Sequence, residues 1–184
     1  MNTPIGDGDF TPERIKRRTL ILCLNILRNY AYLNVCVQKN GKFYETIRNN
    51  FISVITLEWC KIFVDKKGKH YWEKSIEDRG NFITEMIGEL GMCKEAYDRD
   101  VVLFKNFRDE AVAHLDKKNH ITFPNLEITK HTTIYLYEYL MEGDESADNK
   151  NLMPDIRSYY DICAQEAFEA LKCNVCVDQP ASKY

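Results

Sequence analysis

The sequence predicts an all-α protein, built as an antiparallel helical bundle of about six helices. Apolar residues recur at intervals of three and four along most of the chain, the spacing that places them on one face of a helix. The 184 residues include only 8 glycines and 5 prolines, which argues against a turn-rich β-sandwich. No segment shows the apolar–polar alternation typical of a strand. Because the predicted connections are mostly short, consecutive helices are expected to pack antiparallel.

The length corresponds to one domain, since a domain typically has roughly 100–200 residues. Residues 1–10 contain two glycines, a proline and two aspartates, which predicts a flexible N-terminal tail. We therefore expect a single helical-bundle domain over residues 11–171, followed by a C-terminal tail over residues 172–184.

The first helix is expected to begin after Thr11, whose side chain can cap free N–H groups. Pro12 suits the first helical position, where its missing N–H has no consequence. The pair Asn40-Gly41 is expected to end this helix, because glycine adopts positive φ without strain.

The second helix is expected over residues 43–63 and is apolar on most of its circumference, which predicts burial by several neighbours. The sequence Lys-Lys-Gly at 66–68 ends it. Residues 75–78 resemble a capping box with Asp in place of Glu, which predicts that a third helix begins there and ends at Gly91. The remaining helices are expected over residues 94–115, over residues 126–141 and, after Pro154, as far as Leu171.

Two ionisable residues of the expected fourth helix interrupt its apolar face. On a helical wheel of about 100° per residue, Arg108 and His114 both lie on the apolar arc, about 120° apart. In a structural interpretation, Arg108 pairs with a carboxylate on a neighbouring helix and His114 is hydrogen-bonded in the core, since an unpaired buried cation is costly. In a functional interpretation they form an anion site: Arg presents a planar fork to phosphate oxygens and His moves protons near neutral pH. Such a pair can cleave a phosphodiester without a metal.

The stretch FRDEAVAHLD, residues 107–116, resembles the signature of the HEPN superfamily. That signature is an Arg, usually followed by a polar residue, and a His, with four to six residues between the Arg and the His. Arg108, Asp109 and His114 match it, with five residues between Arg108 and His114.

An extended match points to one branch of that superfamily. The sequence Ala-His-x-Asp at 113–116 is similar to the AbiU-like branch, which is related to phage abortive-infection proteins. Trp59, Trp72 and the segment 124–139 fit this branch as well. The resemblance spans roughly residues 43–141.

The resemblance implies a dimeric helical bundle that acts as a metal-independent endoribonuclease in toxin–antitoxin or antiphage systems. His114 would act as general base on the ribose 2′-OH or as general acid at the leaving oxygen. Arg108 would stabilise charge on the phosphoryl group, and Asp109 would orient Arg108 or His114. The expected products are a 2′,3′-cyclic phosphate and a 5′-OH, formed in a cleft between two protomers without a cofactor. Several HEPN proteins are not nucleases, so a non-catalytic bundle that binds a nucleotide, RNA or a protein partner is the alternative.

The charge balance gives little support to RNA binding. The chain has 25 Lys and Arg against 28 Asp and Glu, a net charge of −3, whereas nucleic-acid binders are typically basic. Lys117 and Lys118 directly follow the motif and are the candidate RNA-binding residues. Such clusters also occur as ordinary solvated surface. The expected partners are RNA or a nucleotide, a second copy of the chain and a cognate antitoxin.

The seven cysteines come without a recognisable signal peptide. No apolar run reaches the roughly 18 residues that a membrane span requires. We therefore expect a cytoplasmic protein with reduced thiols and no membrane contact. Cys173 and Cys176 have metal-ligand spacing, but a zinc site needs four ligands and no second pair is present, so no metal is expected.

Overall fold

The computed structural model describes residues 11–76, 80–112, 123–142 and 153–173, and within these ranges it contains helices and no strand. The prediction of an all-α helical bundle is confirmed. The six α-helices of the described part are α1 (Pro12–Cys36), α2 (Lys42–Phe63), α3 (Phe82–Glu89), α4 (Lys94–Phe107), α5 (Glu127–Glu142) and α7 (Ile156–Cys173). A 3₁₀ turn spans Trp72–Lys74 and a π-helical turn spans Arg108–Val112.

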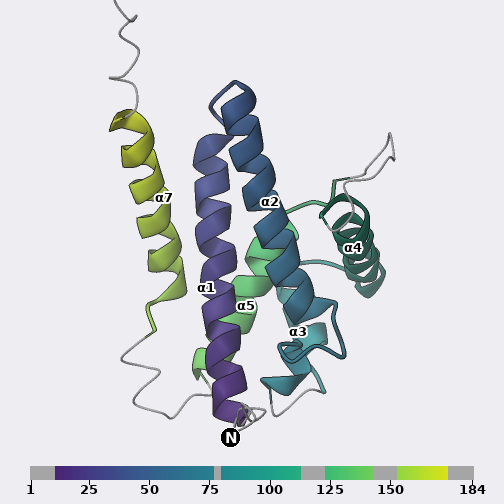
Figure 1. The fold of residues 1–184 in the computed structure, drawn as a ribbon. Coiled ribbons are helices and arrows are strands. Elements are labelled where there is room, and N and C mark those ends of the chain that lie inside the picture. Colours follow the sequence, from purple (N-terminus) through teal and green to yellow (C-terminus); the bar gives the residue numbers. More distant parts are fainter. Residues whose placement is uncertain (1–10, 77–79, 113–122, 143–152, 174–184) are drawn as a thin grey trace, which may run out of the picture.

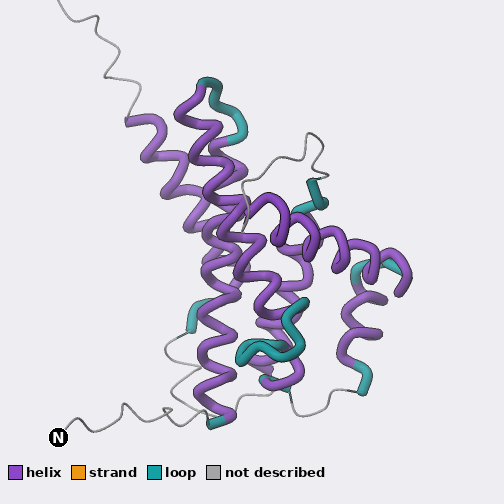
Figure 2. Tube along the Cα trace, turned by 45° about the vertical axis from the view of Figure 1, so that its right-hand side comes forward, coloured by secondary structure: helices purple, strands orange, loops and turns teal. Residues whose placement is uncertain are grey.

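Helix α1 is the central element of the bundle and packs against α2, α5 and α7 (Figure 1). α2 and α5 run antiparallel to α1, whereas α7 runs in the same direction on the side of α1 away from α2. α4 lies on the other side of α2 and runs across the long axis of the bundle, with the short α3 beside it (Figure 2). The C-terminal end of α4 is therefore brought to the C-terminal half of α2.

Trp59 joins three helices in the core. Its ring is fully buried, and its Nε1 donates to Thr132 Oγ1 of α5 at 2.9 Å. The ring centroid of Phe104, on α4, lies 4.5 Å away. The prediction that several neighbours bury the second helix is confirmed for its C-terminal half. Within that half, Val54 and Leu57 are exceptions and are exposed.

α1 begins where the sequence predicted, but it ends earlier than predicted. Thr11 caps the helix, since Oγ1 accepts from the Arg14 N–H at 3.4 Å, and Pro12 is the first helical residue. Helical bonding ends at Cys36, before the expected Asn40-Gly41. Gly41 does adopt a positive φ of 109°, but it precedes the first residue of α2.

The predicted start of the third helix is wrong. Residues Trp72–Lys74 form a 3₁₀ turn, and α3 begins only at Phe82. The Ser75 hydroxyl shares a hydrogen bond of 3.0 Å with Thr19 on α1. Trp72 stacks on Phe82 with ring centroids 5.0 Å apart, so burial of Trp72 decides the local conformation. Gly91 has a φ of 63° and follows α3, as predicted.

The later helices match their predicted positions closely, with one exception. α5 and α7 begin within one or two residues of expectation, and α7 continues to Cys173. The fourth helix was expected to reach Leu115, but α-helical bonding ends at Phe107 and a π-helical turn follows. A π-helical turn holds more residues than an α-turn, so the 100° per residue of the helical wheel does not hold over Arg108–Val112.

The predicted N-terminal tail over residues 1–10 and the part of the predicted C-terminal tail from residue 174 onward lie outside the described residues. Among the helices that are described, none combines the length and the apolar character needed to cross a membrane.

Candidate functional site

Arg108 lies at the junction between α4 and the π-helical turn. Its backbone N–H donates to the carbonyls of Phe104 and Lys105, and it is the last residue to continue the helical bonding of α4. π-Helical turns are rare and occur frequently at functional sites. The Arg108 side chain is only 18% exposed, because it lies against the end of α2.

Two carboxylates bind the Arg108 guanidinium. Nη1 donates to Asp65 Oδ1 at 2.6 Å, and Nε donates to Asp109 Oδ1 at 2.9 Å. Asp65 follows the last residues of α2, where its N–H donates to the Cys60 carbonyl at 2.9 Å. We call these four residues, Arg108, Asp65, Asp109 and Cys60, the Arg108 cluster.

The structural interpretation expected Arg108 to pair with a carboxylate on a neighbouring helix. Such a pair is observed, because Asp65 at the end of α2 binds Arg108. Both carboxylates are nevertheless partly open to solvent, with side-chain exposures of 39% for Asp65 and 49% for Asp109. The salt bridges of Arg108 are therefore partly buried, and their contribution to stability lies between that of a buried and that of a surface salt bridge.

The charges of the cluster set its protonation states. Burial alone lowers the pKa of Arg108, but the hydrogen bonds that it donates to Asp65 and Asp109 outweigh this effect and raise the pKa above its ordinary value. Arg108 is therefore a permanent cation. With two ionised carboxylates the cluster has a formal charge of −1, which disfavours anions unless one carboxylate moves away.

Cys60 forms the buried wall of the cluster. Burial raises the pKa of its thiol to about 12, although Arg108 acts in the opposite direction. Its Sγ lies 3.8 Å from the Phe104 carbonyl oxygen, to which the thiol donates. The group is therefore a protonated thiol at neutral pH and is no nucleophile.

The structure brings together two of the predicted site residues, Arg108 and Asp109. The other three, His114, Lys117 and Lys118, lie outside the described residues, so their positions relative to Arg108 stay predictions. Asp65 was not singled out from the sequence. The apolar position of Arg108 on the wheel predicted a carboxylate partner, but nothing local to Arg108 identifies one 43 residues earlier.

The described cysteines form no metal centre. Cys23, Cys36, Cys60, Cys93 and Cys163 are free thiols. In the part of the chain that the structure describes, no three His, Cys, Asp or Glu side chains lie close enough to hold a metal ion. Cys176 lies outside the described residues, so the Cys173–Cys176 pair is not tested.

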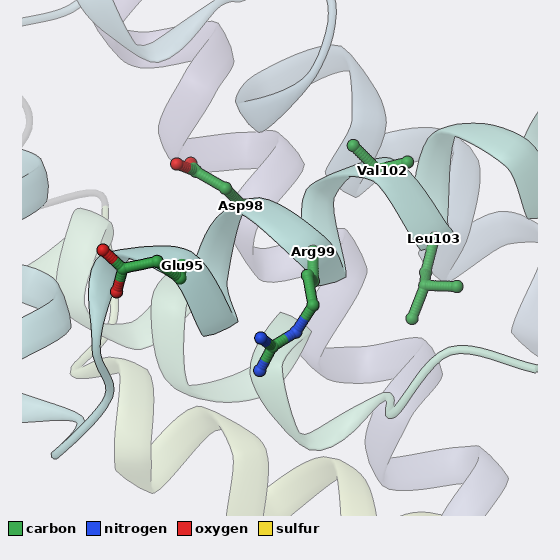
Figure 3. Close-up of a pocket in the computed structure, with 5 residues that line it drawn as sticks. All are labelled: Glu95, Asp98, Arg99, Val102 and Leu103. Carbon is green, nitrogen blue, oxygen red and sulfur yellow. The ribbon is translucent and has the colours of Figure 1, made fainter.

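A separate surface hollow of about 560 Å³ lies along α4. The described residues that line it are Glu95, Asp98, Arg99, Val102 and Leu103. Figure 3 shows that all five come from one helix and that their side chains spread along it without converging on a point. The described wall of this hollow thus brings no set of polar groups together, and the Arg108 cluster is the stronger candidate site.

Fold and site together define an all-α bundle protein with a doubly paired arginine where α4 meets the end of α2. Comparisons with protein-family models, with curated proteins and with solved structures found no match for the chain.

Proposed function

We propose that the protein is a metal-independent endoribonuclease of HEPN type, which acts in toxin-like or antiphage defence. The observation that carries the proposal is the contact between Asp109 and Arg108. Asp109 fixes the guanidinium through Nε at 2.9 Å, which is the orienting role that the HEPN resemblance gives to the residue after the Arg. Asp109 and Asp65 bind Nε and Nη1 of Arg108, and guanidinium N–H groups donate readily to phosphate oxygens.

The proposed reaction is an internal transesterification of RNA. The ribose 2′-oxygen forms a bond to phosphorus while the bond from phosphorus to the 5′-oxygen of the next nucleotide breaks. One imidazole takes the proton of the 2′-OH, and a proton is delivered to the leaving 5′-oxygen. In a homodimer the two copies of His114 can divide these roles. Arg108 stabilises the additional charge on the phosphoryl oxygens, and the products are a 2′,3′-cyclic phosphate and a 5′-OH.

Lys117 and Lys118 are the proposed contacts to the RNA backbone, and a cognate antitoxin is the proposed protein partner. The alternative function is a non-catalytic bundle that binds a nucleotide, RNA or a protein. One observation favours a protein as the ligand of such a bundle, namely the formal charge of −1 in the Arg108 cluster, because sites for RNA and nucleotides are both expected to attract phosphates.

Loss of cleavage in a His114→Ala variant tests the nuclease proposal. Purified wild type is expected to cleave a mixed RNA pool in EDTA, and the variant is expected to lose at least about 100-fold in rate, the usual contribution of a general acid or base. End mapping should show cyclic phosphates. His131→Ala is the matched control. His131 is exposed on α5 and pairs with Glu127 one turn earlier, so its removal should leave cleavage unchanged.

Retained cleavage in the His114→Ala variant would remove the proposed mechanism. Absence of cleavage by the wild type, together with phosphate binding that requires Arg108, would favour the non-catalytic alternative. Size-exclusion chromatography with light scattering tests the homodimer, and a strictly monomeric protein would exclude a site shared between protomers.

A further inference from the structure

The two carboxylates on Arg108 are not equivalent, because they are attached to the chain in different ways. Asp109 directly follows Arg108 in the same π-helical turn, so it moves with the arginine. Asp65 belongs to a different element, the turn after α2, and reaches Arg108 across the space between two helices. The contact with Asp65 can therefore open while the contact with Asp109 stays intact.

The turn that carries Asp65 is tight. The Gly68 N–H donates to the Asp65 carbonyl at 2.6 Å, and a Cβ at Gly68 would lie 2.9 Å from that oxygen, closer than real Cβ atoms approach. The Asp65 N–H also donates to the carbonyl of Cys60 on α2, so the backbone of Asp65 is fixed relative to α2. Its side chain has only two rotatable bonds and is 39% exposed, so release of Arg108 requires a side-chain rotation into solvent and no backbone movement.

Release of Asp65 changes the charge that an incoming anion meets. With Asp65 bound, the formal charge around the guanidinium is −1, whereas without Asp65 it is zero. Lys66 and Lys67 directly follow Asp65 and are exposed, so the turn that carries Asp65 also carries two cations. Coulomb repulsion of a phosphodiester falls accordingly.

We propose that Asp65 is an intrinsic competitor for the anion site of Arg108 and sets its affinity for RNA. A phosphodiester oxygen takes the position of Asp65 Oδ1 on Nη1, while Asp109 keeps Nε and holds the guanidinium in place. This inference rests on the proposed function, since it takes the anion to be an RNA phosphodiester. The competition explains why an anion site has a negative charge in this structure. The structure contains the closed form of the site, in which Asp65 is bound to Arg108.

An Asp65→Asn variant tests the competition. The probe is a fluorescein-labelled 2′-O-methyl RNA of mixed sequence, which lacks the attacking hydroxyl and cannot be cleaved, with fluorescence anisotropy as the readout. Asp65→Asn is expected to bind about tenfold more tightly than wild type, because one charge is removed at hydrogen-bond distance from the guanidinium. The double variant Asp65→Asn/Arg108→Ala is expected to lose this gain. Asp161→Asn is the matched control, because it removes the same charge from an exposed position on α7, on the far side of α1 (Figure 1).

Unchanged or weaker binding by a folded Asp65→Asn variant would overturn the proposal, and so would a gain that survives removal of Arg108. If the variant does not fold, titration of the wild type with the same RNA decides instead. The ¹³C shift of the Asp65 carboxyl should then move as the contact opens, and a constant shift would refute the competition. Failure of the nuclease proposal gives a different result, namely tighter binding by Asp65→Asn without cleavage of unmodified RNA by either protein.

Discussion

The replacement of Arg108 by alanine measures how much the cluster contributes to stability. The change removes two charge-assisted hydrogen bonds, to Asp65 at 2.6 Å and to Asp109 at 2.9 Å. Breaking a fully buried pair costs about 3–5 kcal/mol, because a charge is left without a partner in the core. An exposed pair contributes only about 0.2–1 kcal/mol. Here the arginine is 18% exposed but both carboxylates are more open, so water can solvate them once the arginine is gone.

We therefore expect Arg108→Ala to lower the free energy of unfolding by about 1–2 kcal/mol, between the two limits. Urea denaturation followed by far-UV circular dichroism measures this difference, with equal m-values required for the comparison. In a thermal scan the same loss corresponds to a decrease in Tm of roughly 2–8 °C for a domain of this size.

Arg157→Ala is the matched control. Arg157 on α7 also makes two hydrogen bonds to a carboxylate, from Nε and Nη2 to Glu138 at 2.7 and 3.0 Å. Its side chain is 63% exposed, so its loss should cost less than about 1 kcal/mol. A loss above about 3 kcal/mol for Arg108→Ala would show that the cluster is a structural pair. A loss no larger than that of Arg157→Ala would show that Asp65 holds Arg108 too weakly to compete with an anion.

Two further predictions concern the fold. Thr133 Oγ1 is buried without a hydrogen-bond partner in the described structure, so Thr133→Val should stabilise the protein by about 1 kcal/mol in urea denaturation. Thr132→Val removes the acceptor of Trp59 Nε1 and should instead destabilise the protein by about 1–3 kcal/mol. Equal effects of the two variants would contradict this reasoning. Arg48→Ala should lower the free energy of unfolding by about 1 kcal/mol in the same assay, because Nη1 donates to the carbonyl of Cys36, the last residue of α1, and to that of Lys39 in the following loop. A neutral result would show that water replaces these bonds without loss.

The positions of α2, α5 and α7 could be predicted because their apolar periodicity is local information. The errors fall where a distant residue decides the conformation. α1 ends early, and Arg48 of α2 donates to the carbonyl of its last residue, Cys36, and to that of Lys39 in the following loop. α3 begins late because Trp72 and Ile76 are buried in a non-α conformation that its apolar spacing does not reveal.

In the candidate site, too, the features that depend on neighbouring residues could be predicted and those that depend on distant residues could not. Arg108 and Asp109 are neighbours in sequence, and both could be singled out from the motif and from the helical wheel. The partner Asp65 could not, because the contact depends on α4 running across the bundle and ending beside α2. The π-helical turn was missed for a related reason: residues 108–112 have an unremarkable helical composition, and only their hydrogen bonding distinguishes them.

The stability and affinity of the Arg108 cluster are linked thermodynamically. If RNA binds only the form in which Asp65 has released Arg108, the apparent dissociation constant equals the intrinsic one divided by the fraction of open molecules. A contact that contributes about 1.4 kcal/mol keeps this fraction near one tenth, and its removal tightens binding about tenfold. The coupling between Arg108 and Asp65, obtained from a double-mutant cycle of unfolding free energies, must therefore agree with the gain in RNA affinity of Asp65→Asn. Agreement between two measurements of such different kinds would identify Asp65 as the competing group, whereas a large coupling without a gain in affinity would assign the contact to the fold alone.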